Sequence, residues 1–595
     1  MAGPGAVPDA LRAGLAVVGL FLVCGFALVR LLLPDGLRPY ELLLLLPVGA
    51  CAAAVELAVL GYVHVPLAAN VAVVLGANVV AAVVAVRRVG WPRLPARGRL
   101  GEVGWPLWIA LIVACVALVP MFRAGFAVVQ GYGSDAHLAV GTADFLKHHP
   151  PGVTSVEGPV DQVPLVWRSK PPIYYPMAAV SALSGMETWQ VMAPLMAVLL
   201  AMSAAGFFLL ARTALGAGLA GAVVAMAAVG LDRVALHTTM HPYYNQLWGF
   251  FTLPFAILLA YWAARSRTRG AYALLVLMLV VGALAYPLAV PIPLIALVAL
   301  LWPERGRLRG LWRWWMLIPA LILFAPLLGV VEKAVSSLGV VLDPGRSLRS
   351  WGGDLLAFVP EHQFVSLPSS ALLLLLGPFF LAAIVWELRR QPRGLALALG
   401  GVLLFGVLAA AWFRPRDYGW YFHFKALAFV GPLAVLLAVV AVSRLRKPFA
   451  AVALGACVLF AVQGARDEVV VLYDQTPRQI TELRAEVDER LPPDASIRLD
   501  MDGNQQLWAA YFLSGQPLCS SAPLLDTSYP HVPMSLAADY AVIDNNAAPR
   551  GPSDAAGGPL WEGEQYSLYR LKPRPGEKEN CSRRMVQTVT SVPLN

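Results

Sequence analysis

Long apolar runs separated by short polar or basic segments make up most of the chain up to residue 466. Many runs hold 18 or more residues, which at about 1.5 Å per helical residue is enough to cross roughly 30 Å of hydrocarbon. We count about 14 such runs, so the pattern predicts an all-α polytopic membrane protein. Beyond residue 466 the runs stop, and Pro, Asp and Asn become frequent. The pattern there predicts a helix near 479–490 and strands at 540–544 and 565–571, hence a small C-terminal α/β domain.

Composition and charge narrow the class further. Hydrophobic residues make up 58% of the 595 residues and charged residues 14%, which is more apolar surface than a soluble fold of this size can bury. The formal net charge of +9 comes mainly from basic clusters in alternate short loops, at 87–99, 265–269, 305–313, 389–393 and 444–447. The positive-inside rule places these loops in the cytoplasm, so the charge reflects membrane orientation and we expect no nucleic-acid partner.

Counting spans from these loops assigns a side of the cell membrane to every other segment. The first span, 10–33, is followed by no small-residue cleavage site, so we expect it to stay in the mature chain. The chain divides into N-terminal spans (1–106), a central membrane region (107–466) and a soluble domain (467–595). The soluble domain is predicted to be extracytoplasmic, together with the loops 126–188, 232–246, 335–369 and 414–425.

Cysteines and short motifs limit the chemistry. Cys519 and Cys581 are the two cysteines of the outer domain, and a disulfide between them is left open. The sequence holds no Cys-x-x-Cys pair, metalloprotease helix, P-loop or dinucleotide-binding glycine pattern. The cluster 500–504 begins like a calcium loop but lacks the distal glutamate. We therefore expect no metal site, and the sequence leaves a divalent-cation requirement open.

Polar residues inside the spans help to separate transport from chemistry at the membrane surface. A transporter places ionisable groups near the bilayer midplane, whereas Glu56 is the one acidic residue deep in a predicted span. We interpret Glu56 as a carboxylate that is either neutralised or hydrogen-bonded to a neighbouring helix. The other ionisable residues gather at the outer ends of spans and indicate a cavity open to the outer face: Asp135, Asp232, Arg233, Glu332, Lys333, Arg416 and Lys425.

The polar segment 131–176 begins Gly-Tyr-Gly-Ser-Asp-Ala-His and ends Arg-Ser-Lys-Pro-Pro-Ile-Tyr-Tyr-Pro. An acidic residue in the first large outer loop, followed by Lys-Pro-Pro-hydrophobic-Tyr-Tyr, resembles the GT-C class of integral membrane glycosyltransferases. Within this class, residues 107–300 are similar to the protein O-mannosyltransferase and lipid A aminoarabinose transferase group. Asp135 matches the loop aspartate of that group, and its Lys-Pro-Pro motif is matched by Lys170, Pro171 and Pro172.

The chain departs from that group in two respects. Additional spans precede the loop, and His137 stands where some relatives have a second acidic residue. The leading spans, the Pro-Pro-x-Tyr-x-Pro loop ending and the outer domain are more loosely similar to the mycobacterial galactan arabinofuranosyltransferase family. Lysines are few among the 45 basic residues, as in a GC-rich actinobacterial genome. The sugar stays open between a pentose such as arabinofuranose and a hexose such as mannose.

The resemblance implies a sugar donor carried on polyprenyl phosphate among the membrane lipids, and a glycan, lipid or protein acceptor in water. It implies Asp135 as general base for the acceptor hydroxyl, worth about 10²- to 10⁴-fold in rate. Fixed cations would stabilise the departing phosphate, a role that we assign to Lys170, Arg416 and Lys425. The alternative for 414–425 is an aromatic belt with basic residues that reach the interface.

The segment 237–246 is the third outer cluster of chemistry-bearing residues. Pro242 and the lack of an acidic partner disfavour a metal between His237 and His241. Interfacial packing is the alternative to a binding role. We assign sugar or acceptor contacts to His137, Tyr174, His241, Tyr243 and Asn245.

Other classes of function stay open at this point. A non-catalytic transporter or flippase of lipid-linked glycans would use the same cationic cavity without needing Asp135. A polymerase or ligase acting on diphosphate-linked oligosaccharides would need more cations than the outer segments supply. The segment 343–362 is predicted to be either a loop over the donor site or an interfacial amphipathic helix.

Overall fold

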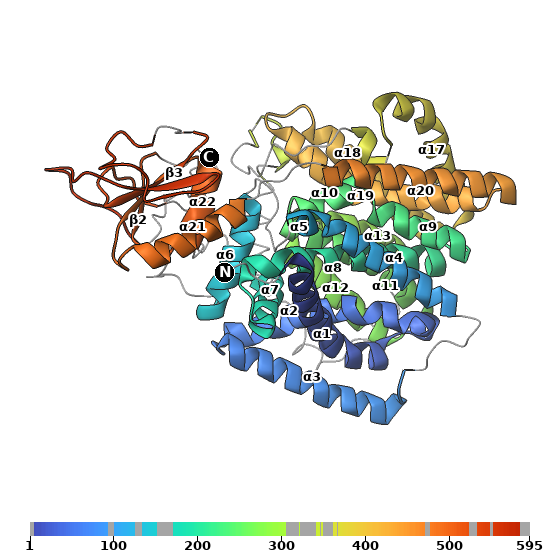
Figure 1. The fold of residues 1–595 in the computed structure, drawn as a ribbon. Coiled ribbons are helices and arrows are strands. Elements are labelled where there is room, and N and C mark those ends of the chain that lie inside the picture. Colours follow the sequence, from blue (N-terminus) through green and yellow to red (C-terminus); the bar gives the residue numbers. More distant parts are fainter. Residues whose placement is uncertain are drawn as a thin grey trace.

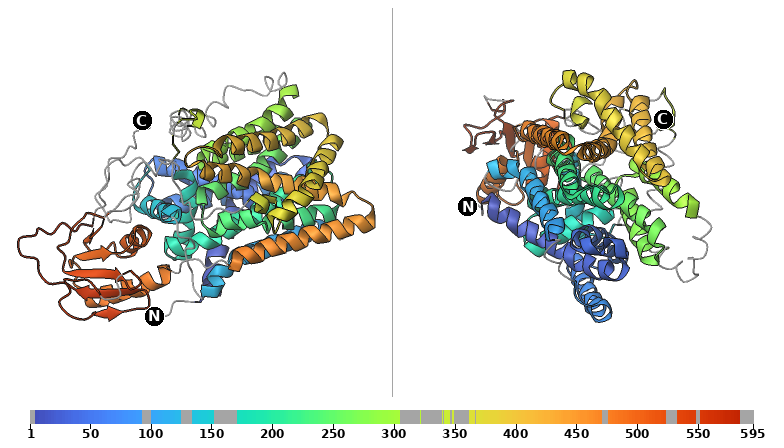
Figure 2. Two further views of the ribbon diagram at one scale, coloured as in Figure 1. Left: turned by 90° about the horizontal axis from the view of Figure 1, so that it is seen from above. Right: turned by 90° about the vertical axis from the view of Figure 1, so that its right-hand side faces the viewer.

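The computed structural model describes residues 5–92, 100–124, 134–151, 171–304, 321, 339, 341–345, 347–348, 361–365, 367–470, 476–522, 532–547 and 551–583. These residues form a bundle of helices and a smaller α/β unit. The sheet of this unit lies beyond one end of the bundle (Figure 1, Figure 2). The helices α6, α21 and α22 lie where the two parts meet (Figure 1).

The bundle has the all-α polytopic character that the apolar runs predict. Within the described ranges, ten helices are long and apolar enough to cross a membrane, or eleven if α9 and α10, bent by 45°, count as one span. The expected number of about 14 refers to the whole chain. The longer helices are α1 (Ala6–Leu32), α2 (Glu41–Tyr62), α3 (Leu67–Val89), α4 (Leu100–Ala117), α8 (Thr188–Leu209), α9 (Leu219–Gly230), α11 (Tyr244–Ser266), α12 (Arg269–Ala285), α13 (Pro291–Leu301), α17 (Ser370–Arg390), α18 (Arg393–Phe413), α19 (Gly419–Ser443) and α20 (Lys447–Val470).

Shorter elements connect and cap these helices. Two helices, α6 (Ser134–His148) and α7 (Pro171–Ser184), follow the first spans, and α10 (Arg233–Met240) follows α9. The remaining short pieces are η1 (Asp35–Tyr40), α5 (Val119–Ala124), η4 (Leu210–Ala214), η5 (Pro287–Ala289), η6 (Trp302–Glu304) and η9 (Glu361–Val365).

α1 and α2 pack closely because glycines face each other where they cross. A Cβ on Gly25 would overlap the carbonyl oxygen of Leu45, and a Cβ on Gly49 would overlap that of Phe21. Small residues allow such close approach in lipid, where burial of apolar surface does not favour one helix partner over hydrocarbon.

Glu56 of α2 accepts a hydrogen bond from the Asn78 amide of α3 at 2.6 Å. The expected pairing of this carboxylate with a neighbouring helix is therefore confirmed. This hydrogen bond joins α2 to α3, so we interpret Glu56 as a residue that helps these two helices to pack.

Buried and partly buried ion pairs lie at the end of the bundle that the basic loops predict to be cytoplasmic. Each joins two helix ends. One pair links the consecutive helices α1 and α2, and the other two link segments that are 110 and 57 positions apart in sequence. Such pairs are costly to break, since a lone buried charge remains. They are Arg30 with Glu41 at 2.6 Å, Arg212 with Glu102 at 2.9 Å and Arg444 with Glu387 at 2.8 Å.

The C-terminal unit is a mixed five-stranded sheet of order β2-β1-β3-β5-β4. β1 pairs in parallel with β2 and β3, while β5 runs antiparallel to β3 and β4. Three predicted elements are confirmed, as α21, β3 and β5. The elements are α21 (Thr476–Arg490), β1 (Ile497–Asp500), α22 (Gly503–Phe512), β2 (Leu518–Ser520), β3 (Tyr540–Asp544), β4 (Trp561–Glu562) and β5 (Tyr566–Arg570).

A disulfide joins Cys519 in β2 to Cys581 near the end of the described chain. The pairing left open by the sequence is thus present in the structure. It holds the segment after β5 against the edge of the sheet, where Leu518 and Ser582 also form a bridge.

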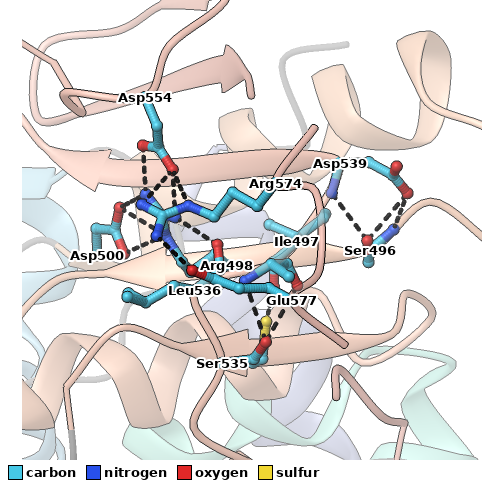
Figure 3. Close-up of polar contacts among 12 residues, drawn as sticks. Ser496, Ile497, Arg498, Asp500, Ser535, Leu536, Asp539, Asp554, Arg574 and Glu577 are labelled. Carbon is cyan, nitrogen blue, oxygen red and sulfur yellow. Dashed lines mark hydrogen bonds and ion pairs between the residues drawn. The ribbon is translucent and has the colours of Figure 1, made fainter. Parts of the chain in front are cut away.

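An arginine network ties β1 to two loops (Figure 3). The guanidinium of Arg498 donates to Asp500 at 2.8 Å, to Asp554 at 2.8 Å and to the carbonyl oxygen of Leu536 at 2.7 Å. Arg574 adds a further bond to Asp554 at 3.0 Å. Hydrogen bonding to Arg498 lowers the pKa of Asp554 to about 2. The buried arginine therefore has carboxylate partners, as burial of a charge requires.

Candidate functional site

The short helix α10 positions the site. Asp232 caps its N-terminus, since the Asp232 carboxylate accepts hydrogen bonds from the backbone N–H groups of Val234 at 2.9 Å and Ala235 at 3.2 Å. α10 packs against α20, α8, α11, η9 and α19. The predicted outer segments 232–246 and 414–425 consequently meet at one end of the bundle.

A buried carboxylate organises α10. Glu468, in the last turn of α20, is 1% exposed and accepts hydrogen bonds on both oxygens. One oxygen lies 2.7 Å from Nδ1 of His237, and the other lies 3.2 Å from Nε of Arg233. A carboxylate at one ring nitrogen sets the tautomer and orientation of a histidine. Nε2 of His237 is buried and has no hydrogen-bond partner among the described residues, so it can accept a hydrogen bond.

Aromatic rings extend this cluster toward α19. The rings of His237 and His241 stack with centroids 5.2 Å apart, and Tyr243 lies 5.2 Å from His241. Lys425 of α19 is 4% exposed, and its Nζ lies 3.2 Å from the ring centroid of Tyr243. A cation over an aromatic face is electrostatically favourable, and the interaction holds the ammonium in this buried position.

A second polar contact joins α7 to the start of α11. The hydroxyl of Tyr174 donates to Oδ1 of Asn245 at 2.7 Å, and Tyr244 donates to the carbonyl oxygen of Ile173 at 2.6 Å. The rings of Tyr174 and Tyr244 stack at 5.6 Å. Tyr174 and Asn245, both predicted as sugar or acceptor contacts, are thus brought together. Tyr243, the residue before Tyr244, belongs to the ring cluster around Lys425.

An apolar cavity of about 220 Å³ lies next to this polar cluster, between α11, α12 and α13. Phe429 of α19 lines it, one helical turn after Lys425. Gly249 of α11 also lines it, and a Cβ there would come within 2.7 Å of Cβ of Tyr286. A buried cation and an apolar hollow are thus neighbours along one helix, as an amphiphilic ligand requires.

Arg416 lies in the loop before α19 and donates to backbone carbonyl oxygens. Its guanidinium reaches Val341 at 2.7 Å and Asp343 at 2.6 Å. Burial lowers the pKa of Arg416. These bonds tie the loop to the segment 341–345.

His137 lies on α6 against the C-terminal unit. Its ring is fully buried, 5.5 Å from Trp508 and 6.2 Å from Tyr511 of α22. Neither ring nitrogen has a hydrogen-bond partner among the described residues, and burial lowers the pKa of His137 to about 4. The imidazole is therefore neutral at neutral pH.

The remaining predicted site residues lie at the start of α6 or outside the described residues. The backbone of Asp135 belongs to the first turn of α6, and its side chain is outside the described residues. Lys170, Glu332 and Lys333 are outside the described residues, as is most of 343–362.

Sequence reasoning missed Glu468, and it assigned no role to His237. Glu468 reads as an ordinary acidic residue at the end of a span, and it lies 231 positions from His237 in sequence. The sequence does show an acidic side chain in the last turn of an apolar helix, but this position does not indicate which residue the carboxylate contacts.

Comparisons with known proteins bear on the fold. No protein-family profile and no curated protein sequence matches the chain. Among solved structures, ArnT from Cupriavidus metallidurans bound to undecaprenyl phosphate is similar at 14% identity, over 79% of this chain and 98% of that chain, with a TM-score of 0.45.

Two mycobacterial structures are also similar. Arabinofuranosyltransferase AftD from Mycobacteria matches at 14% identity, over 80% of this chain and 40% of that one, with a TM-score of 0.48. Arabinosyltransferase EmbB from Mycobacterium smegmatis matches at 20% identity, over 62% of this chain and 34% of that one, with a TM-score of 0.34. At these identities and TM-scores, no family and no residue role is carried over from them to this chain.

Proposed function

We propose that this protein is a membrane glycosyltransferase of GT-C type. It transfers a sugar, a pentose such as arabinofuranose or a hexose such as mannose, from polyprenyl phosphate to a glycan, lipid or protein of the cell envelope. The observation that supports this most directly is the buried ammonium of Lys425 one helical turn from an apolar cavity. A lipid phosphate needs both, a cation for its head and an apolar space for its chain.

The reaction requires one proton transfer and one bond exchange. As the acceptor oxygen attacks the anomeric carbon, its proton passes to the carboxylate of Asp135. The bond between that carbon and the phosphate oxygen breaks, and polyprenyl phosphate leaves with the bonding electrons. Lys425 stabilises the charge on the departing phosphate, with Lys170 and Arg416 proposed for the same role.

Neutral polar groups would hold the sugar. We assign this contact to Tyr174, His241, Tyr243 and Asn245, which offer ring faces and paired donors and acceptors. The polar segments involved follow helix ends on the side of the bundle that carries the C-terminal unit. The basic loops support an extracytoplasmic position for that side.

Replacement of Asp135 by Asn tests the base. In purified full-length protein supplied with polyprenyl-phosphate sugars, we expect the transfer rate to fall by about 10²- to 10⁴-fold while undecaprenyl phosphate still binds. Asp35→Asn is the matched control, since the Asp35 side chain is 98% exposed in η1, after α1. Transfer by Asp135→Asn at the wild-type rate would refute the base assignment.

The alternative of a transporter or flippase predicts a different result. The wild-type protein would then move lipid-linked glycans across vesicle membranes without transferring sugar, and Asp135→Asn would not change that movement. Glu56 offers this alternative little support, because its carboxylate already accepts a hydrogen bond from Asn78.

A further inference from the structure

A second cavity, of about 280 Å³, lies where the C-terminal unit meets the helices. Its walls come from the last turns of α6, the start of α8, the helices α21 and α22, and residues 513–516. It is distinct from the apolar cavity beside Lys425, which α11, α12 and α13 surround. Most residues that line it are polar, unlike those of the first cavity.

Ion pairs and hydrogen bonds hold the walls in place. The carboxylate of Asp144 on α6 accepts hydrogen bonds from Thr188 of α8 and from Tyr511 of α22. It also lies 2.8 Å from Nζ of Lys147. Across the cavity, Arg484 of α21 pairs with Glu187 at 3.0 Å. Contacts between three separate parts of the chain thus shape the cavity before any ligand binds.

The charges in the walls indicate a neutral ligand. The three carboxylates of Asp144, Glu187 and Asp488 outnumber the two cations of Lys147 and Arg484. A phosphate or an acidic sugar would meet these carboxylates at close range, which is unfavourable. A ligand with many hydroxyl groups can donate to carboxylates and accept from Lys147 and Arg484 without adding charge.

One polar atom of the wall lacks a partner. Gln516 is 6% exposed and lines the cavity, and its Oε1 has no hydrogen-bond donor among the described residues. A buried unpaired carbonyl oxygen costs free energy until a donor reaches it. A ligand hydroxyl is such a donor once the Gln516 side chain turns toward the cavity.

We propose that this cavity binds a neutral sugar unit of a glycan acceptor, at a distance from the point of transfer. This inference rests on the proposed function, because it takes the acceptor of that reaction to be an oligosaccharide. The volume is at the small end of ligand pockets, which run from about 300 Å³ upward, and suits one or two sugar rings.

The spacing along α6 adds a length requirement. Asp135, the proposed base, and Asp144 in the cavity wall are nine residues apart on this helix, or about 14 Å along its axis. A single sugar ring cannot span that distance. An acceptor with several sugars therefore fills the cavity while its end lies at Asp135, whereas a short acceptor reaches Asp135 alone.

Direct binding to the full-length protein, with no donor present, tests the cavity. The probes are neutral arabino-, galacto- and manno-oligosaccharides of increasing length, followed by saturation-transfer NMR. For a series that binds, Gln516→Leu should weaken binding roughly 3- to 10-fold by removing one hydrogen bond, and Gln516→Glu, which keeps an acceptor oxygen, should retain it better. Gln505→Leu is the matched control, since Gln505 is equally buried but does not line the cavity.

Transfer assays separate this proposal from the proposed function. For long acceptors, Gln516→Leu should raise KM and leave kcat unchanged, and for short acceptors it should change neither. Binding of oligosaccharides without transfer from any polyprenyl-phosphate sugar would support the cavity and refute the transferase. The cavity proposal is overturned if none of the series binds, or if Gln516→Leu and Gln505→Leu bind them alike.

Discussion

Lys425 offers the sharpest test of how the donor is held. Its ammonium is 4% exposed and lies 3.2 Å from the ring centroid of Tyr243. Lys425→Met removes the charge and keeps an unbranched side chain of similar length, so the helix and the apolar packing around it should persist. Lys425→Arg keeps the charge.

The magnitude follows from the bond that is lost. A hydrogen bond to a charged group contributes about 1.5 to 3 kcal/mol. Since about 1.4 kcal/mol corresponds to a tenfold change, Lys425→Met should weaken phosphate binding roughly 10- to 150-fold.

The assay compares two lipids on purified protein in detergent. Undecaprenyl phosphate and the uncharged alcohol undecaprenol each compete with a fluorescent polyprenyl-phosphate analogue. Lys425→Met should weaken the phosphate and leave the alcohol unchanged, because the alcohol relies on the apolar cavity alone. Lys425→Arg should bind the phosphate nearly as well as the wild type.

The control is a lysine away from the site. Lys447 is exposed at the start of α20, whose other end carries Glu468 of the site, so Lys447→Met should bind both lipids like the wild type. The reasoning is refuted if Lys425→Met binds undecaprenyl phosphate normally. It is also refuted if both lipids weaken equally, since the loss would then be one of packing.

Three further predictions concern the framework around the site. Glu468→Gln should lower stability by about 3 kcal/mol by breaking a buried ion pair. The measurement is the melting temperature, and the control is Glu482→Gln, which changes an exposed carboxylate of α21. Equal melting temperatures for the two variants would contradict this prediction. Burial lowers the pKa of His137 in the folded protein to about 4, below its ordinary value of 6.5, so the folded state favours the neutral ring. Stability should be full above pH 6.5 and fall by about 3 kcal/mol as pH drops toward 4; hydrogen exchange of α22 should rise in that window, and should not in His137→Gln. Replacing Cys519 and Cys581 by Ser opens a 62-residue loop and should cost roughly 4 kcal/mol, seen as faster proteolysis of the C-terminal unit; unchanged cleavage would argue against it.

The amino-acid sequence was enough to predict the membrane class and three elements of the C-terminal unit. Each apolar run that is long enough to cross the hydrocarbon core predicts a helix, because the length of a hydrophobic run is a local property of the sequence. For the same reason the alternation at 540–544 predicted β3, and the amphipathic run at 479–490 predicted α21. The segments 232–246 and 414–425 were also recognisable as polar interruptions.

Which of these polar residues come into contact depends on how the helices pack. In lipid every apolar helix face is equivalent, so hydropathy does not say which helices are neighbours, and small residues such as Gly25 and Gly49 set the contacts instead. The pairing of Glu468 with His237 and Arg233, and the seat of Lys425 over Tyr243, follow from that packing. So does the polar cavity that α6 shares with the C-terminal unit, because its walls come from segments that are far apart in the chain.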